Sequence, residues 1–154
     1  MRREIERKFL VAGEGWRGRA TGIPIRQGYL CSCEERSVRV RLAGGRGTLT
    51  VKGAMVGASR AEYEYDIPPE DANALLDALC ERPLIEKTRY VVVEAGLAWE
   101  VDVFTGDNTG LIVAELELGD EAQRVDLPAW IGEEVTGDPR YLNANLFRNP
   151  FGRW

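Results

Sequence analysis

Apolar and polar residues alternate along most of the chain, which is the pattern of β-strands with one buried face. Glycine and proline residues interrupt the alternation at intervals and indicate turns. Because successive side chains of a strand point to opposite faces, each run has one apolar and one polar face. The pattern predicts eight strands, over residues 3–11, 24–33, 36–43, 46–53, 60–67, 84–95, 98–105 and 111–119.

The segments between the strands predict hairpins and two helices. The glycines after Ala43 and the Ala95-Gly96 pair have the composition of tight hairpin turns. A helix is predicted to follow Pro68, because acidic residues come next and leucines then recur at helical spacing. A shorter helix is expected around residues 140–147. Short, closely spaced hairpins favour one mainly β (α+β) domain over residues 1–154, an antiparallel sheet or barrel with a few flanking helices.

Charged residues of these strands share one face and occur in pairs of like sign. The pairs are Arg39/Arg41, Lys87/Arg89, Glu62/Glu64, Glu100/Asp102 and Glu115/Glu117. For any single strand, an ordinary sheet with one face in water explains this pattern. Like charges on one face repel, however, and a sheet selected only for solubility would intersperse the two signs. We therefore favour an eight-stranded barrel with a charged lumen and an apolar outer face covered by helices.

This lumen would bring together two sets of charged side chains. The acids are Glu4, Glu6, Glu62, Glu64, Glu100, Asp102, Glu115 and Glu117, and the bases are Lys8, Arg39, Arg41, Lys52, Lys87 and Arg89. Clustered carboxylates favour a hard divalent cation such as Mg²⁺ or Mn²⁺. Clustered arginine and lysine favour phosphate oxygens. A lumen with both sets indicates a metal–polyphosphate complex, and hence phosphoryl transfer or hydrolysis.

Composition excludes several other kinds of chemistry. The chain has no histidine, which rules out Ser-His-Asp and Cys-His catalysis and sites with histidine ligands. A net charge of −5 argues against general affinity for nucleic acids or anionic membranes. Cys31, Cys33 and Cys80 form no CxxC motif and are typical of reduced thiols. With neither a secretory signal nor an apolar run of about 20 residues, we expect a cytoplasmic protein.

The N-terminal Glu4-Ile5-Glu6-Arg7-Lys8 resembles the E-x-E-x-K signature of the CYTH, or triphosphate tunnel metalloenzyme, superfamily. Further segments that resemble the family follow in the family's order, so that the resemblance spans nearly the whole chain. They are residues 25–30 (IRQGYL), 37–41 (SVRVR), 49–53 (LTVKG), 62–64 (EYE), 86–90 (EKTRY), 99–104 (WEVDVF), 114–118 (AELEL) and 135–143 (VTGDPRYLN).

The resemblance implies a fold and an activity. The family fold is an eight-stranded antiparallel β-barrel tunnel that binds triphosphate and a divalent metal. Its members include inorganic tripolyphosphatases, thiamine triphosphatases, class IV adenylate cyclases and RNA 5′-triphosphatases. This chain looks most like the short bacterial branch, which implies hydrolysis of inorganic tripolyphosphate to pyrophosphate and phosphate by a metal-activated water. The chain lacks the His-Phe lead-in of many cyclases, and that departure disfavours the cyclase reading.

Alternative functions remain open at this point. Within the enzyme class they are thiamine or nucleoside triphosphatase and class IV-like adenylate cyclase. A non-catalytic module that binds polyphosphate or nucleotide is the alternative from another class. The expected partner is a small molecule with a triphosphate group, with no nucleic acid and no membrane. Exposed apolar barrel edges would favour a homodimer.

Residue roles follow from the charge pattern together with the resemblance. The expected metal ligands are Glu4, Glu6, Glu115 and Glu117, and the expected phosphate-binding residues are Arg39, Arg41, Lys52, Lys87 and Arg89. Lys8 would contact phosphate or assist proton transfer, and Glu62, Glu64 and Asp102 would orient the bases or help to hold metal. The family permits Tyr29 and Lys87 as an alternative general acid/base, and Arg140 would touch substrate at one tunnel mouth.

The four tryptophans are expected to pack or to lie at the surface rather than to stack on a ligand. Trp99 is out of phase with Glu100 and should therefore face away from the lumen. We expect the same packing or surface role for Trp16, Trp130 and Trp154.

Overall fold

The computed structural model describes residues 5–54, 56, 60–120 and 122–154. The eight predicted strands are present, with bounds that differ by at most a few residues from those expected; residues 3 and 4 of the first predicted strand lie outside the described residues. The strands are β1 (Ile5–Val11), β2 (Ile23–Ser32), β3 (Arg36–Ala43), β4 (Arg46–Gly53), β5 (Glu62–Ile67), β6 (Ile85–Glu94), β7 (Leu97–Phe104) and β8 (Ile112–Leu118).

The other elements are short, apart from one helix. The predicted helix after Pro68 is α1 (Pro69–Ala78), and the one expected near residue 140 is divided into η2 (Pro139–Tyr141) and α2 (Asn143–Leu146). Two further 3₁₀ turns are η1 (Gly106–Asn108) and η3 (Phe151–Arg153). A ninth strand, β9 (Ile131–Glu134), was not expected, because four residues ending in two glutamates show no alternation. None of the helices among the described residues is long and apolar enough to span a membrane.

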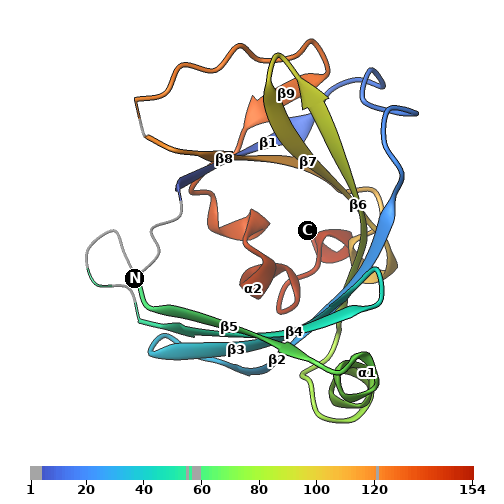
Figure 1. Cartoon of the computed structure of the whole chain (residues 1–154), viewed down its shortest axis with the longest axis vertical. Helices are drawn as coiled ribbons and strands as arrows, with labels where there is room; N and C mark the ends of the chain where they lie inside the picture. Colours follow the sequence, from blue (N-terminus) through green and yellow to red (C-terminus); the bar gives the residue numbers. More distant parts are fainter. Residues whose placement is uncertain (1–4, 55, 57–59, 121) are drawn as a thin grey trace.

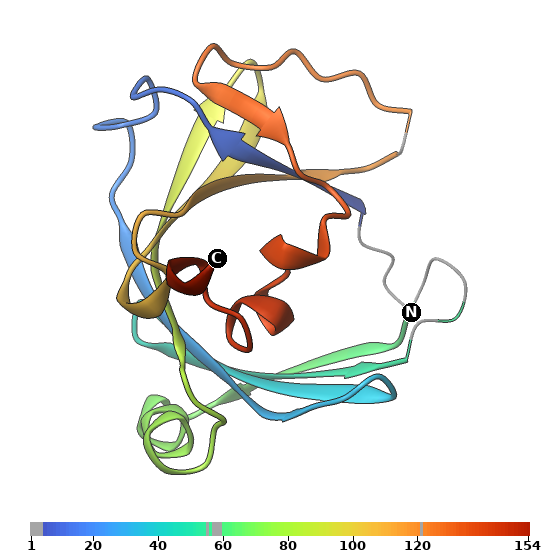
Figure 2. The same cartoon turned by 180° about the vertical axis from the view of Figure 1, so that it is seen from behind.

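All the strands belong to one antiparallel sheet, in the order β5-β4-β3-β2-β6-β7-β8-β1-β9. The sheet curls until its two ends face each other across a common interior (Figures 1 and 2). Among the described residues, backbone hydrogen bonds do not join β5 to β9. The structure is therefore the predicted antiparallel tunnel in the form of a strongly curved sheet with two free edges, rather than a hydrogen-bonded ring.

The two tight hairpins have the predicted turn chemistry. Gly44 and Gly45 join β3 to β4 with φ values of +55° and +83°. Ala95 and Gly96 join β6 to β7 with φ values of +52° and +76°. Two successive residues with positive φ match the twist of the flanking strands, which fixes the register of each hairpin.

The apolar outer face of the sheet is covered in two ways. The helix α1 packs on β3 and β4, where Val40, Ala72 and Leu76 are fully buried. Over β1, β7 and β8 the cover comes from loops, contrary to the expectation of helices, and these loops carry Trp16 and Trp130. Trp130 meets the ring of Trp99 edge to face, with ring centroids 5.9 Å apart. Trp99 thus faces away from the lumen, as predicted.

The interior is charged at one end and apolar at the other. Residues 139–154 enter the curved sheet and lie inside it (Figures 1 and 2). Leu146 and Phe147 of this segment pack against Ile85, Phe104 and Val113 on the inner face of the sheet. The C-terminal segment therefore fills one end of the lumen, and the charged residues surround what is left.

Candidate functional site

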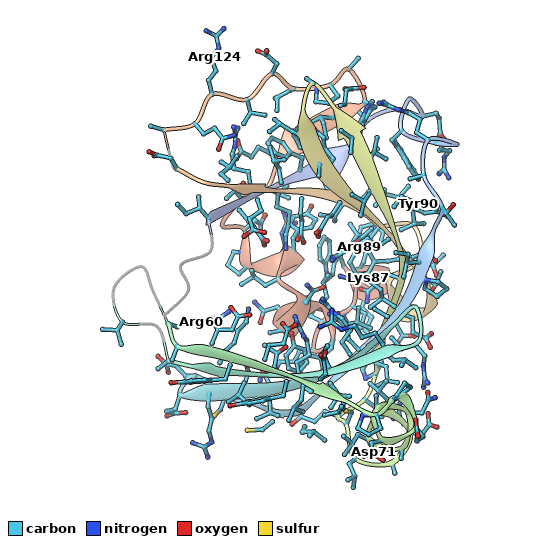
Figure 3. The ribbon with its side chains drawn as sticks, in the orientation of Figure 1. Arg60, Asp71, Lys87, Arg89, Tyr90 and Arg124 are labelled. Carbon is cyan, nitrogen blue, oxygen red and sulfur yellow. The ribbon has the colours of Figure 1, made fainter. Side chains whose placement is uncertain are left out.

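The charged end of the lumen encloses a cavity of about 440 Å³, which we call the lumen cavity. Its lining contains Asn143 from α2 and the charged residues Glu6, Arg39, Arg41, Lys52, Glu62, Glu64, Arg89, Glu100, Glu115 and Glu117. Of the remaining predicted lumen residues, Lys8, Lys87 and Asp102 are buried behind this lining, and Glu4 lies outside the described residues. Figure 3 shows Lys87 and Arg89 directed into the interior, whereas Tyr90, the residue after Arg89, lies on the other face of β6 and points outward.

Carboxylates of β1, β7 and β8 form the acidic side of the lumen cavity. Strand register places Glu6 opposite Glu117 and Glu100 opposite Glu115. Directly opposed side chains have Cβ atoms about 5 Å apart, so these like charges repel and attract a cation. Burial raises the pKa of Glu100, although nearby Arg89 acts to lower it.

Oxygen donors of this kind suit a hard divalent cation. Among the described residues, no group of three or more His, Cys, Asp or Glu side chains is close enough to hold a metal ion. The fit to a divalent cation therefore rests on the type of donor atom alone. Glu4, the fourth expected carboxylate ligand, lies outside the described residues.

Asp102 anchors a buried ion cluster behind the lining. Its carboxylate is 1% exposed and accepts two hydrogen bonds from Arg89, from Nε at 2.8 Å and from Nη2 at 2.9 Å. Lys87 Nζ lies 2.9 Å from Asp102 Oδ2 as an ion pair without hydrogen-bond geometry. Burial alone would raise the pKa of Asp102, but Lys87 and Arg89 outweigh it and lower the pKa to about 2. Asp102 therefore stays ionised and holds two of the predicted phosphate-binding cations in place.

The pKa values of Lys87 and Arg89 shift in opposite directions within this cluster. Lys87 is fully buried, and burial lowers its pKa while Asp102 opposes the shift. Burial would also lower the pKa of Arg89, but its bonds to Asp102 raise it above the ordinary value. Arg89 also forms an ion pair with Glu100, between Nη1 and Oε2 at 2.9 Å, and lines the cavity, which Lys87 does not.

Arg39 and Arg41 supply positive charge that the described protein groups leave uncompensated. Neither forms an ion pair with a carboxylate of the described residues, and Lys52 lines the cavity beside them. Arg39 makes one long hydrogen bond, from Nη2 to Thr50 Oγ1 at 3.4 Å, and its buried Nε has no partner. Burial lowers the pKa of Arg41 to about 10, with Arg39 and Arg89 adding to the shift. This side of the cavity therefore carries positive charge, which favours an anion.

Gln27 holds Arg41 and was not foreseen from the sequence. Its side chain is fully buried, and its Oε1 accepts a hydrogen bond from Arg41 Nε at 2.9 Å. Its Nε2 is buried without a partner. The available signal was its phase, because Gln27 lies two residues before Tyr29 on the inner face of β2. A sequence search limited to charged residues does not find Gln27, because its side chain is uncharged.

Lys8 connects the first strand to the C-terminal segment. Its Nζ donates a hydrogen bond to the Tyr141 carbonyl at 3.0 Å and lies 3.4 Å from Glu115 Oε1. The backbone of Val135 donates to the Lys8 carbonyl at 2.8 Å. The predicted active lysine is therefore held between the acidic side of the lumen and the segment that fills its other end.

Two predicted residues lie away from the lumen cavity. Tyr29 is buried and stacks on Phe147, with ring centroids 5.1 Å apart, and burial raises its pKa. Tyr29 does not line the lumen cavity, so the structure does not bring it to the cavity as a partner of Lys87. Arg140 does not line it either: its guanidinium pairs with Asp138 at 2.8 Å, because Asp138 caps the turn in which Arg140 lies.

Comparison with known proteins gives a consistent set of relatives. The family model described as CYTH domain matches residues 2–148. An inorganic triphosphatase of Acetivibrio thermocellus is 53% identical over 98% of this chain and 97% of its own length. An inorganic triphosphatase of Nitrosomonas europaea is 41% identical over 93% of this chain and 95% of its own.

Solved structures agree with these relatives. A crystal structure of an inorganic triphosphatase has a TM-score of 0.73 and 38% identity, over 96% of this chain and 95% of that one. A putative adenylate cyclase of Bacillus halodurans has a TM-score of 0.56 and 17% identity, over 77% of this chain and 81% of that one. At that identity the second likeness concerns the fold alone.

Proposed function

Because the chain belongs to the CYTH domain family, we propose that it is a divalent-metal-dependent enzyme that hydrolyses inorganic triphosphate to pyrophosphate and phosphate. The observation that carries this function is the division of one cavity into a side of carboxylates and a side with Arg39 and Arg41, which form no ion pair with a carboxylate of the described residues. A polyanion carried together with a divalent cation satisfies both sides at once.

One set of lumen cavity residues would bind the metal, and the other set would bind the phosphate groups. Glu6, Glu115 and Glu117, together with Glu4, would hold Mg²⁺ or Mn²⁺ through carboxylate oxygens. When bound, the cation neutralises phosphoryl charge and activates the attacking water. Arg39, Arg41, Lys52 and Arg89 would bind the phosphoryl oxygens, with the planar guanidinium groups giving paired hydrogen bonds.

The buried groups would keep this arrangement rigid. Asp102 fixes Arg89, and Gln27 fixes Arg41, so the two guanidinium groups meet the substrate with little loss of side-chain freedom. Lys8 would contact phosphate or assist proton transfer from its position beside Glu115. The C-terminal segment fills one end of the lumen with apolar side chains.

The lining of the cavity favours an inorganic triphosphate over its organic relatives. Among the described residues, no aromatic side chain lines the lumen cavity. A nucleobase or thiazolium ring would therefore find no aromatic side chain of the described residues to stack on there. For this reason thiamine triphosphatase, nucleoside triphosphatase and adenylate cyclase rank below the inorganic activity.

A phosphate-release assay tests the proposed function. Tripolyphosphate, thiamine triphosphate and ATP would each be supplied with Mg²⁺, with Mn²⁺ and with a chelator. We expect metal-dependent turnover that is fastest on tripolyphosphate, with pyrophosphate and phosphate formed in equal amounts. We also expect metal plus tripolyphosphate to raise the melting temperature, because ligands that bind the folded state stabilise it. A raised melting temperature without turnover would indicate a binding module, and cyclic AMP from ATP would indicate a cyclase.

A Gln27→Met variant tests whether this residue positions Arg41. Methionine keeps the volume of the buried side chain but removes the acceptor of the 2.9 Å hydrogen bond. One hydrogen bond contributes about 0.5–1.5 kcal/mol, so we expect KM for tripolyphosphate to rise about 2- to 10-fold with kcat nearly unchanged. Gln27→Glu keeps an acceptor but neutralises Arg41 and should raise KM further. The control is Gln123→Met, in the loop after β8; a fall in melting temperature with unchanged KM would contradict the positioning role.

A further inference from the structure

A second pocket, of about 280 Å³, adjoins the lumen cavity at the end of the β2–β3 hairpin. Its cationic lining residues are Arg36, Arg39, Lys52, Arg60 and Arg148, and we call it the basic pocket. Glu34 is the one carboxylate among the described residues that line it. Because Arg39 and Lys52 line both cavities, the basic pocket continues the cationic side of the lumen outward.

Three arginines of the basic pocket have no ion-pair partner among the described residues. Arg36, Arg60 and Arg148 form no ion pair with a described carboxylate, and the buried Nε of Arg39 has no hydrogen-bond partner. The phenol of Tyr29, 6% exposed, also lines the pocket. Burial raises the pKa of Tyr29, and the charges of Arg60 and Arg148 oppose the rise, so both act on the same buried group. Several cations with one acid form a site for an anion with more than one charge.

Part of the basic pocket is held in place before any ligand binds. Arg148 donates a hydrogen bond from Nη2 to the Ser32 carbonyl, and its guanidinium carbon lies 5.3 Å from the ring centre of Phe147. Phe147 in turn stacks on Tyr29. Arg60 lies beside the start of β5, at the open side of the curved sheet (Figure 3). The pocket therefore pairs a fixed arginine from the C-terminal segment with one near the edge of the sheet.

We propose that the basic pocket is a second condensed-phosphate subsite, which receives the pyrophosphate released from the lumen cavity. The proposal rests on the proposed function, in which the carboxylates hold the cation and Arg39 and Lys52 are among the residues that bind phosphoryl oxygens. The two product anions repel each other, and the carboxylates of β1, β7 and β8 repel both. Arg39 and Lys52, which line both cavities, give pyrophosphate an attractive path from the lumen cavity into the basic pocket.

Calorimetric titration with pyrophosphate tests the subsite without turnover. The full chain would be titrated in chelator at low salt, as the wild type, as the single variants Arg60→Gln and Arg148→Gln, and as the double variant. We expect each substitution to raise Kd for pyrophosphate about 3-fold and the double variant about 10-fold, with smaller effects at high salt. Arg124→Gln removes the same charge far from the pocket (Figure 3) and should leave Kd unchanged.

The remaining outcomes separate this proposal from its rivals. An unchanged Kd in the double variant would overturn the subsite, and so would an equal rise in Kd for pyrophosphate and in KM for tripolyphosphate, because the pocket would then belong to the substrate site. A loss confined to linear tetraphosphate would overturn the assignment to product and place the tail of a longer substrate there. If the variants bind pyrophosphate more weakly but the wild type hydrolyses no triphosphate, the anion subsite would stand and the proposed function would fall. Because Arg148 also contacts Ser32, Arg60→Gln keeps the test valid if Arg148→Gln fails to fold.

Discussion

A Glu6→Gln variant is expected to lose metal-dependent tripolyphosphate hydrolysis by about 100-fold or more while it keeps its fold. Glutamine preserves the size of the side chain but removes the charge opposite Glu117 that would hold the cation. Loss of an outer-shell partner of a metal ligand already costs about 10- to 100-fold, and a ligand itself should cost more. Initial rates of phosphate release, measured over a range of Mg²⁺ and Mn²⁺ concentrations, give the effect.

The matched control for this variant is Glu81→Gln. Glu81 is exposed beyond the end of α1 and outside the lumen cavity, so it changes charge in the same way without touching the site. Wild-type turnover is expected for the control. Partial recovery of Glu6→Gln at high metal concentration would support a role in metal affinity, whereas near-wild-type activity at every concentration would remove Glu6 from the metal site.

An Asp102→Asn variant is expected to be less stable by about 3–5 kcal/mol at pH 7, because it leaves Lys87 and Arg89 without their buried counter-charge. The contribution of Asp102 also depends on pH in a definite direction. Its folded pKa of about 2 lies below the ordinary value of 3.8, so its stabilisation is complete above pH 4 and is lost as pH falls toward 2. The shift corresponds to about 2 kcal/mol.

Urea unfolding between pH 7 and pH 2 measures both effects of the Asp102 substitution. The stability difference between wild type and variant should be constant down to about pH 4 and should shrink below it. Asp126→Asn, an exposed substitution in the loop before β9, is the control and should follow the wild type at each pH. A difference that stays constant from pH 7 down to pH 2 would show that folding does not lower the pKa of Asp102.

The alternation of residues was enough to predict which side chains share the lumen, because the phase of a strand is a local property. Arg39 and Arg41, or Glu115 and Glu117, must lie on one face whatever surrounds the strand. The depth of each residue could not be predicted in this way. Lys87 and Arg89 have the same phase, yet Lys87 is buried behind the cavity beside Phe104 and Arg89 lines it. That difference depends on where the C-terminal segment packs, which the strand pattern does not contain.

The parts of the fold that were missed have short or irregular sequences. The two loops that carry Trp16 and Trp130 cover the outer face of the sheet without any helical period. The segment from Pro139 to Trp154 consists of short turns whose apolar residues gain their burial from the inner face of the sheet. Such placement depends on tertiary contacts, and local propensity does not reveal it.

The pairing of β1 with β8 also has a consequence for how the chain assembles. More than a hundred residues separate Glu6 from its partner Glu117. During synthesis, the edge of β1 therefore stays without its β8 partner until most of the chain has been made. An unpaired strand edge invites association with other chains, and inward-facing charges are a common protection against it. Glu6 and Lys8 lie on one face of β1, and Arg7 lies on its other face. The charges proposed to bind metal and phosphate in the finished molecule therefore also keep its first strand soluble while it is being made.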